Sequence, residues 1–85
     1  MTDRPIEAVR NLGPRTGAWL REIGVSTEAE LKAKGAIATY RALKSARGGK
    51  LSLNALYAMQ AGIMDIDWRE LPAPFKQALL EEVRD

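Results

Sequence analysis

Helix-breaking residues divide this chain into short segments. Glycine or proline recurs at residues 13–14, 24, 35, 48–49, 62 and 72–74. Between these positions apolar residues follow the spacing of amphipathic helices, and no segment shows the sustained alternation of a β-strand. Segments of this length do not persist as isolated helices, so their stability must come from packing against one another. We therefore predict an all-α, compact single domain of five to six short helices over residues 1–85.

Local signals place the helix boundaries. Asp3 is a candidate N-cap for the first helix, Thr27 and Glu30 have the spacing of a capping box, and Ser52 and Asp67 are candidate caps further on. The last helix presents Phe75, Leu79, Leu80 and Val83 on one stripe. The predicted helices span about 4–11, 14–22, 27–35, 36–46, 52–62 and 73–84, with a short turn at 67–71.

The composition excludes most catalytic chemistry. The chain contains no cysteine and no histidine, and its carboxylates are scattered over predicted helix faces. Disulfides, thiol nucleophiles and the commonest metal ligand and general base are therefore absent. We expect a protein that is not an enzyme and that binds no metal and no cofactor. The start of the chain has no long apolar stretch, so we expect no signal peptide, no membrane span and a cytoplasmic location.

The charge is distributed unevenly along the chain. The net charge is only +2, but residues 1–50 hold ten basic and five acidic residues, whereas residues 51–85 hold three basic and six acidic ones. A basic half of this kind suits a polyanion, although mixed charges on solvated helix faces are an equally good interpretation.

The stretch NLGPRTG at residues 11–17 starts a helix without a capping side chain. Pro14 suits the first helical position, and Gly13 as N-cap has no side chain to accept hydrogen bonds from the following amides. The amides of Gly13, Arg15 and Thr16 are then open to an anion, with the charge of Arg15 beside them and Gly17 leaving the approach uncluttered. This arrangement predicts a phosphate-sized site built mostly from backbone.

The same stretch resembles the hairpin of the helix-hairpin-helix motif, in which two glycines flank an apolar residue. Leu12 is the apolar residue and Gly13 the second glycine, while Asn11 replaces the first. Asparagine tolerates positive φ, so the turn can survive. Two outcomes are open: the Asn11 hairpin keeps the amides aligned for phosphate, or the Asn11 side chain folds over them and leaves only a turn.

The stretch around Gly48-Gly49 has two possible interpretations, a second hairpin or a simple loop between two helices. Setting Gly13 against Gly49 also matches Thr16 with Ser52, which suggests a degenerate pair of hairpins. The Gly-Pro-basic core is missing at the second position, and this favours the simple loop.

A set of residues spread over most of the chain forms a recognisable combination: Leu12-Gly13-Pro14, Trp19-Leu20, Gly24, Thr27, Leu31, Gly35-Ala36, Ser52-Leu53-Asn54, Leu56-Tyr57-Ala58, Trp68 and Leu71-Pro72. With this combination the chain resembles the C-terminal domain of the TfoX/Sxy competence regulators, over about residues 7–83. The resemblance implies a small all-helical domain with helix-hairpin-helix character, here in its stand-alone form, and a bacterial role related to competence or transcription.

Two functions follow as hypotheses. The first is a non-catalytic module that binds the DNA backbone weakly and without reading sequence. Its phosphate site comprises Gly13, Arg15 and Thr16, bordered by Arg10, Arg47 and Lys50 if the two loops come together. The second is a protein-interaction module that assists another DNA-binding regulator, which the small net charge favours. Trp19 and Trp68 could stack on bases, but their spacing with apolar neighbours favours a place in the core.

Overall fold

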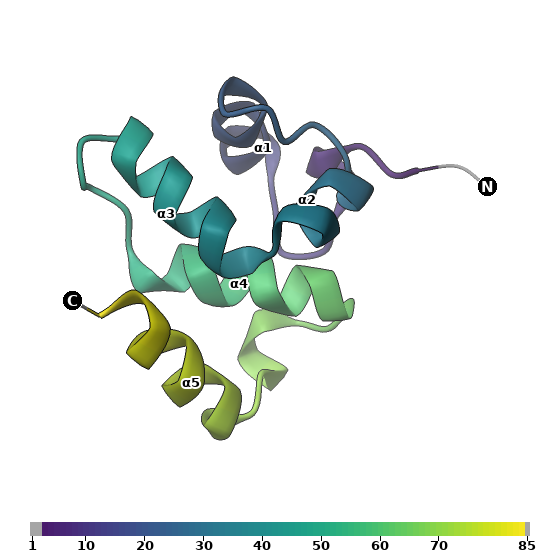
Figure 1. Cartoon of the computed structure of the whole chain (residues 1–85). Coiled ribbons are helices and arrows are strands. Elements are labelled where there is room, and N and C mark those ends of the chain that lie inside the picture. The colour runs from purple at the N-terminus through teal and green to yellow at the C-terminus, as the bar shows by residue number, and fades with distance from the viewer. Residues whose placement is uncertain (1–2, 85) are drawn as a thin grey trace.

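The computed structural model describes residues 3–84 and is all-helical (Figure 1). Over these residues no strand forms, and the elements are five α-helices and two single 3₁₀ turns. They are η1 (Ile6–Ala8), α1 (Pro14–Glu22), α2 (Glu28–Lys34), α3 (Ala36–Ala46), α4 (Leu53–Met64), η2 (Trp68–Glu70) and α5 (Ala73–Val83). The predicted fold class is confirmed, and the predicted bounds of α1, α2 and α3 match closely.

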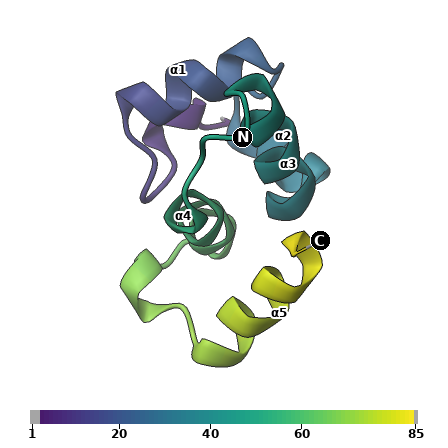
Figure 2. The same ribbon diagram turned by 90° about the vertical axis from the view of Figure 1, so that its left-hand side faces the viewer.

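Helix α4 is the central element. Figure 2 views it nearly along its axis, with α1, α2 and α3 on one side and η2 and α5 on the other. Its sequence, LNALYAMQAGIM, contains no charged residue, and α4 contacts α2, α3, α5 and η2. A helix that is apolar around much of its circumference can be covered on several sides at once, which explains this position.

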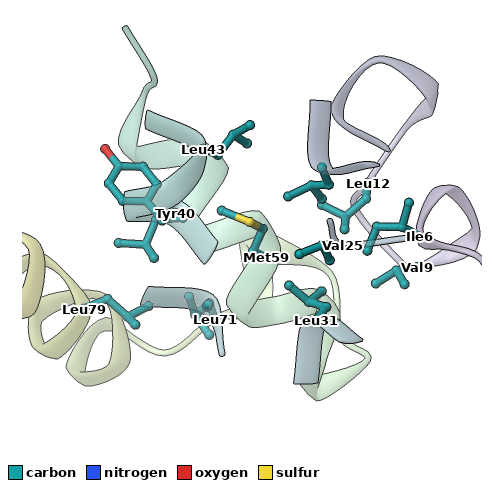
Figure 3. Packing of buried hydrophobic residues seen from close by; sticks show 13 residues of the cluster. Ile6, Val9, Leu12, Val25, Leu31, Tyr40, Leu43, Met59, Leu71 and Leu79 are labelled. Atoms are coloured by element: carbon teal, nitrogen blue, oxygen red, sulfur yellow. The ribbon is translucent and has the colours of Figure 1, made fainter. Parts of the chain in front are cut away.

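One hydrophobic cluster joins all the elements (Figure 3). Leu56 and Met59 of α4 are fully buried, as are Leu20 of α1 and Leu31 of α2. Leu71, just after η2, and Leu79 of α5 extend the cluster to the C-terminal side. The core therefore ties together segments from both ends of the sequence.

The helix predicted over residues 4–11 is wrong: only the single turn η1 forms there. Residues 4–5 instead run extended beside residues 26–28, with a bridge between Pro5 and Thr27. The amide of Ile6 donates to the Ser26 carbonyl at 2.9 Å, and the amide of Glu28 donates to the Arg4 carbonyl at 2.8 Å. This pairing uses backbone groups that a longer helix would need.

The start of α2 is fully capped. Thr27 Oγ1 accepts from the Glu30 amide at 3.3 Å, and Glu30 Oε1 accepts from the Ser26 amide at 2.9 Å. Asp3 was predicted to cap the first helix, but its carboxylate accepts from the Ala29 amide of α2 at 3.0 Å. Asp3, Thr27 and Glu30 thus all serve as capping residues, although Asp3 caps a different helix from the one predicted, because the N-terminal segment lies along α2.

A second contact fixes η1 against α1. The carboxylate of Glu7 accepts two hydrogen bonds from the Arg21 guanidinium, at 2.6 and 2.7 Å. The Glu7 side chain lies over Gly17, where an added Cβ would come within 2.6 Å of Glu7 Cγ. Gly17 therefore makes room for Glu7, and does not serve the anion approach that the sequence suggested.

We predict that the Glu7–Arg21 pair makes folding stability acid-sensitive. The hydrogen bonds from Arg21 lower the pKa of Glu7 from its ordinary 4.5 to about 2. A carboxylate whose pKa is lower in the folded state stabilises the fold above its unfolded pKa and loses this effect as the pH falls toward its folded pKa. The stability difference between the wild type and Glu7→Gln, measured by urea unfolding, should therefore shrink between pH 4.5 and pH 2. A difference independent of pH would contradict this account.

Thr39 supplies a second stability prediction. It is fully buried in α3, and its hydroxyl has no hydrogen-bond partner within residues 3–84. Thr39→Val replaces this hydroxyl by a methyl group of similar shape, so we expect the free energy of unfolding to rise by about 1 kcal/mol. Thr39→Ser keeps the hydroxyl, loses the methyl group and should be less stable than the wild type. A Thr39→Val variant that unfolds more easily would show that the hydroxyl is bonded in solution.

Candidate nucleic-acid interface

The N-terminus of α1 is open, as the sequence predicted. Gly13 is the N-cap and has no side chain that could accept a hydrogen bond from the following amides, and Pro14 occupies the first turn. Within residues 3–84 no acceptor is found for the amides of Gly13, Arg15 or Thr16. These donors stand at the positive end of the helix dipole, where an anion is favoured.

Asn11 decides which of the two predicted outcomes holds. Its φ is +74°, and the amide of Leu12 closes the turn onto the Val9 carbonyl at 3.0 Å. Positive φ at the third position of such a turn requires glycine or asparagine. The side chain turns away from α1: Nδ2 donates to the Ile66 carbonyl at 2.8 Å, and Oδ1 accepts from the Trp68 amide at 3.0 Å. Asn11 therefore holds the hairpin in place and leaves the α1 amides uncovered.

The hairpin also rests directly on the central helix. Gly62 of α4 faces it so closely that an added Cβ would lie 2.8 Å from the Arg10 carbonyl oxygen and 2.9 Å from a Val9 methyl carbon. Leu12 at the tip of the turn is buried in the core. Backbone contact with α4 and the Asn11 bridge together fix the direction in which α1 begins.

A surface groove of about 330 Å³ lies beside this helix start. From the hairpin and α1 it is lined by Asn11, Thr16 and Trp19, and Trp68 of η2 closes it on another side. The loop before α4 and the first turns of α4 supply the rest: Leu51, Ser52, Asn54, Ala55 and Ala58. The two loops that the sequence hypothesis required to meet thus do meet, across a groove that we call the tryptophan groove.

The start of α4 borders the same groove and is also open. Ser52 is its N-cap, as predicted, but its side chain makes no capping hydrogen bond. Within the described part of the chain the amides of Leu53 and Asn54 find no acceptor, and the side-chain amide of Asn54 is likewise unbonded. Residues from the first turns of two uncapped helices, Thr16 of α1 and Asn54 of α4, therefore line one groove.

Both tryptophans of the chain line this groove, although 48 residues separate them in sequence. Trp19 is half-buried and packs against the core, as expected. Trp68 keeps 37% of its surface exposed, so its predicted role as a core residue is only partly met. The Arg47 guanidinium lies 3.9 Å from the centroid of the Trp19 ring and covers one of its faces.

The predicted cations differ in their surroundings. Arg47 stacks on Trp19, Arg15 precedes the groove residue Thr16, and Lys50 precedes the groove residue Leu51. Within residues 3–84 none of these three makes an ion pair, whereas Arg10 lies 3.9 Å from Glu70. Arg15, Arg47 and Lys50 can therefore serve an external anion directly, while Arg10 already has a carboxylate partner.

The second hairpin does not have the predicted register. Gly48 and Gly49 have φ of +67° and +83° and end α3, with the Gly49 amide donating to the Lys44 carbonyl at 2.8 Å. The N-cap of α4 is Ser52, so the residue equivalent to Gly13 is Ser52 and not Gly49. The glycines serve as a helix stop, and the stretch 47–52 is an inter-helix loop.

Residues 3–84 contain no cluster of three or more carboxylates that could hold a metal ion. Among the helices of this part of the chain, none combines the length and the apolar character that crossing a membrane requires.

The comparisons with known proteins assign the family. The TfoX C-terminal domain family matches residues 2–83, so this chain belongs to that family. The resemblance predicted from the sequence is thereby confirmed. No protein of curated function matches the sequence.

A crystal structure supports the fold. An uncharacterized protein from Listeria monocytogenes, solved in a triclinic form, superposes with a TM-score of 0.84 and 23% identity. The match covers 88% of this chain and 84% of that one. At this identity the likeness concerns the fold alone.

We predict a graded loss of stability at Asn11. Asn11→Gly keeps the positive φ but removes both hydrogen bonds to residues 66–68, so the free energy of unfolding should fall by about 1–2 kcal/mol. Asn11→Ala adds the strain of a left-handed conformation and should lose about 1–2 kcal/mol more. Asn54→Ala removes an exposed amide that makes no hydrogen bond, and it should stay within about 0.5 kcal/mol of the wild type.

Urea unfolding of the three variants tests this order. Equal stability of Asn11→Gly and the wild type would mean that the bridge to residues 66–68 does not hold the hairpin.

Proposed function

We propose that this domain is a non-catalytic module that binds the phosphate backbone of DNA without reading its sequence. The observation that carries the proposal is the open start of α1, where the amides of Gly13, Arg15 and Thr16 have no acceptor within residues 3–84. Backbone amides at a helix N-terminus bind phosphate through both hydrogen bonding and the helix dipole. In the same chain the first amides of α2, those of Glu28, Ala29 and Glu30, have acceptors in Arg4, Asp3 and Thr27.

The surrounding charge supports a polyanion. Arg15 and Lys50 precede the groove residues Thr16 and Leu51 in the sequence, and Arg47 stacks on Trp19. No acidic side chain is among the lining residues of the groove in the described chain. Contacts to phosphate position a protein on nucleic acid but carry no sequence information. A competence or transcription-related role, which the TfoX/Sxy resemblance implies, would then be accessory, with DNA contact in support of another factor.

We predict that charge reversal at the rim abolishes binding. The double variant Arg15→Glu with Lys50→Glu should show no binding in fluorescence anisotropy with labelled duplex DNA at low salt. Two cations that attract phosphate are lost, and the new carboxylates repel it. The wild type should bind with a Kd of about 10⁻⁴ to 10⁻⁶ M and weaken steeply with salt.

A matched control carries the same change in net charge. Lys34 and Arg84 are exposed and lie outside the groove, so Lys34→Glu with Arg84→Glu should retain most of the binding. Equal loss in the two double variants would show that only net charge matters, and unchanged binding in the first would overturn the proposed surface.

One observation favours protein interaction as a second function. Phe75, predicted to lie on the buried stripe of the last helix, is 45% exposed, and Met64 is 37% exposed. Exposed large apolar side chains are typical of surfaces that bind other proteins. The titration with duplex DNA separates the two functions, since a protein-interaction module would show no binding even at low salt.

A further inference from the structure

We infer that the tryptophan groove takes an unpaired nucleobase, so that the domain prefers single-stranded to double-stranded DNA. This inference rests on the proposed function, because it adds a base-binding site to the proposed phosphate site. The groove unites the chain's two tryptophans, and one of them, Trp68, keeps 37% of its surface exposed.

The chemistry of the groove fits a base flanked by phosphates. Aromatic rings offer a stacking surface that accepts any base, because every base has a π-face. Trp19 has one face covered by Arg47 at 3.9 Å, which places a cation at the groove wall. Asn54 lines the groove, and its side-chain amide makes no hydrogen bond within residues 3–84, so it can bond a base edge.

Charge complementarity favours a nucleotide over an apolar peptide as the occupant. Arg15, in the first turn of α1, and Lys50, in the loop before α4, each precede a groove residue in the sequence, and within the described chain the groove lining includes no carboxylate. A strand that lies across the groove can meet both cations with its phosphates while one base enters between the tryptophans. A duplex keeps its bases stacked inside, so it can use the cations but not the rings.

The size of the groove agrees with a single small ring system. Its volume of about 330 Å³ lies at the lower end of the range of small-molecule sites, about 300–1,000 Å³. The groove therefore suits one base at a time, with neighbouring nucleotides held by their backbone.

The test compares two strands with equal charge. An oligothymidylate of about 10 nucleotides and a fully abasic strand of the same length carry the same phosphates, and only the first has bases. Because the groove contains both tryptophans, oligothymidylate should quench the intrinsic emission of the protein, while the abasic strand should not. We expect the oligothymidylate to bind about tenfold more tightly, equivalent to ~1.4 kcal/mol.

Variants of Trp68 locate the effect. Trp68→Ala should weaken oligothymidylate binding by about tenfold and leave the abasic strand unaffected, and Trp68→Phe should restore most of the difference because it keeps an aromatic face. Circular dichroism checks that each variant is folded, and the emission measurement on the wild type tests the inference without any substitution.

The outcomes separate the two proposals. Equal binding of both strands with unchanged emission would overturn the base site and leave the phosphate site standing. If neither strand bound at low salt while duplex DNA did, the base site alone would be overturned. If the two strands and duplex DNA all failed to bind, the proposed function and the base site would be overturned together.

Discussion

The side chain of Asn11 is the contact on which the rest of the site depends. It connects the hairpin before α1 to residues Ile66 and Trp68, more than fifty positions away in sequence, through one donated and one accepted hydrogen bond. Since this side chain is fully used there, it cannot cap α1. The same two bonds fix the backbone of Trp68, so the hairpin and one wall of the tryptophan groove are positioned together.

The packing of α4 supplies the second constraint. Gly62 lets the hairpin backbone rest directly on the central helix, since a side chain at this position would collide with the Arg10 carbonyl. The hairpin before α1 thus lies near the C-terminal end of α4, and the groove extends from Asn11, Thr16 and Trp19 to the loop and first turns that begin α4.

Much of the fold follows from local sequence signals. Pro14, the Thr27–Glu30 box and Gly35 act within a few residues of where they occur, and the helices they bound are confirmed. The N-terminal segment was mispredicted because its conformation depends on pairing with residues 26–28, which periodicity does not register. At Gly49 the favoured interpretation, a simple inter-helix loop, agrees with the structure, because the two glycines end α3 and do not precede α4 directly.

The candidate site, like the fold, was predictable from the sequence only in part. The open amides of α1 were predictable, since Gly13 lacks a capping side chain wherever the helix lies. The tryptophan groove was not, because Trp19 and Trp68 meet only through tertiary packing, and each one alone has the spacing of a core residue. Asn11 stood out in the sequence as a departure from the hairpin pattern, but its hydrogen-bond partners, Ile66 and Trp68, lie in the segment that follows α4 and only tertiary packing brings them close.

The most direct measurement of the central claim is an amide NMR titration of the intact chain with a short DNA strand at low salt. If the open helix starts hold phosphate, the largest shifts should fall on the amides of Gly13, Arg15 and Thr16, followed by those of Leu53 and Asn54. The capped amides of α2, at residues 28–30, should stay in place. Shifts concentrated on α2 or α5, with the α1 amides unchanged, would contradict the account.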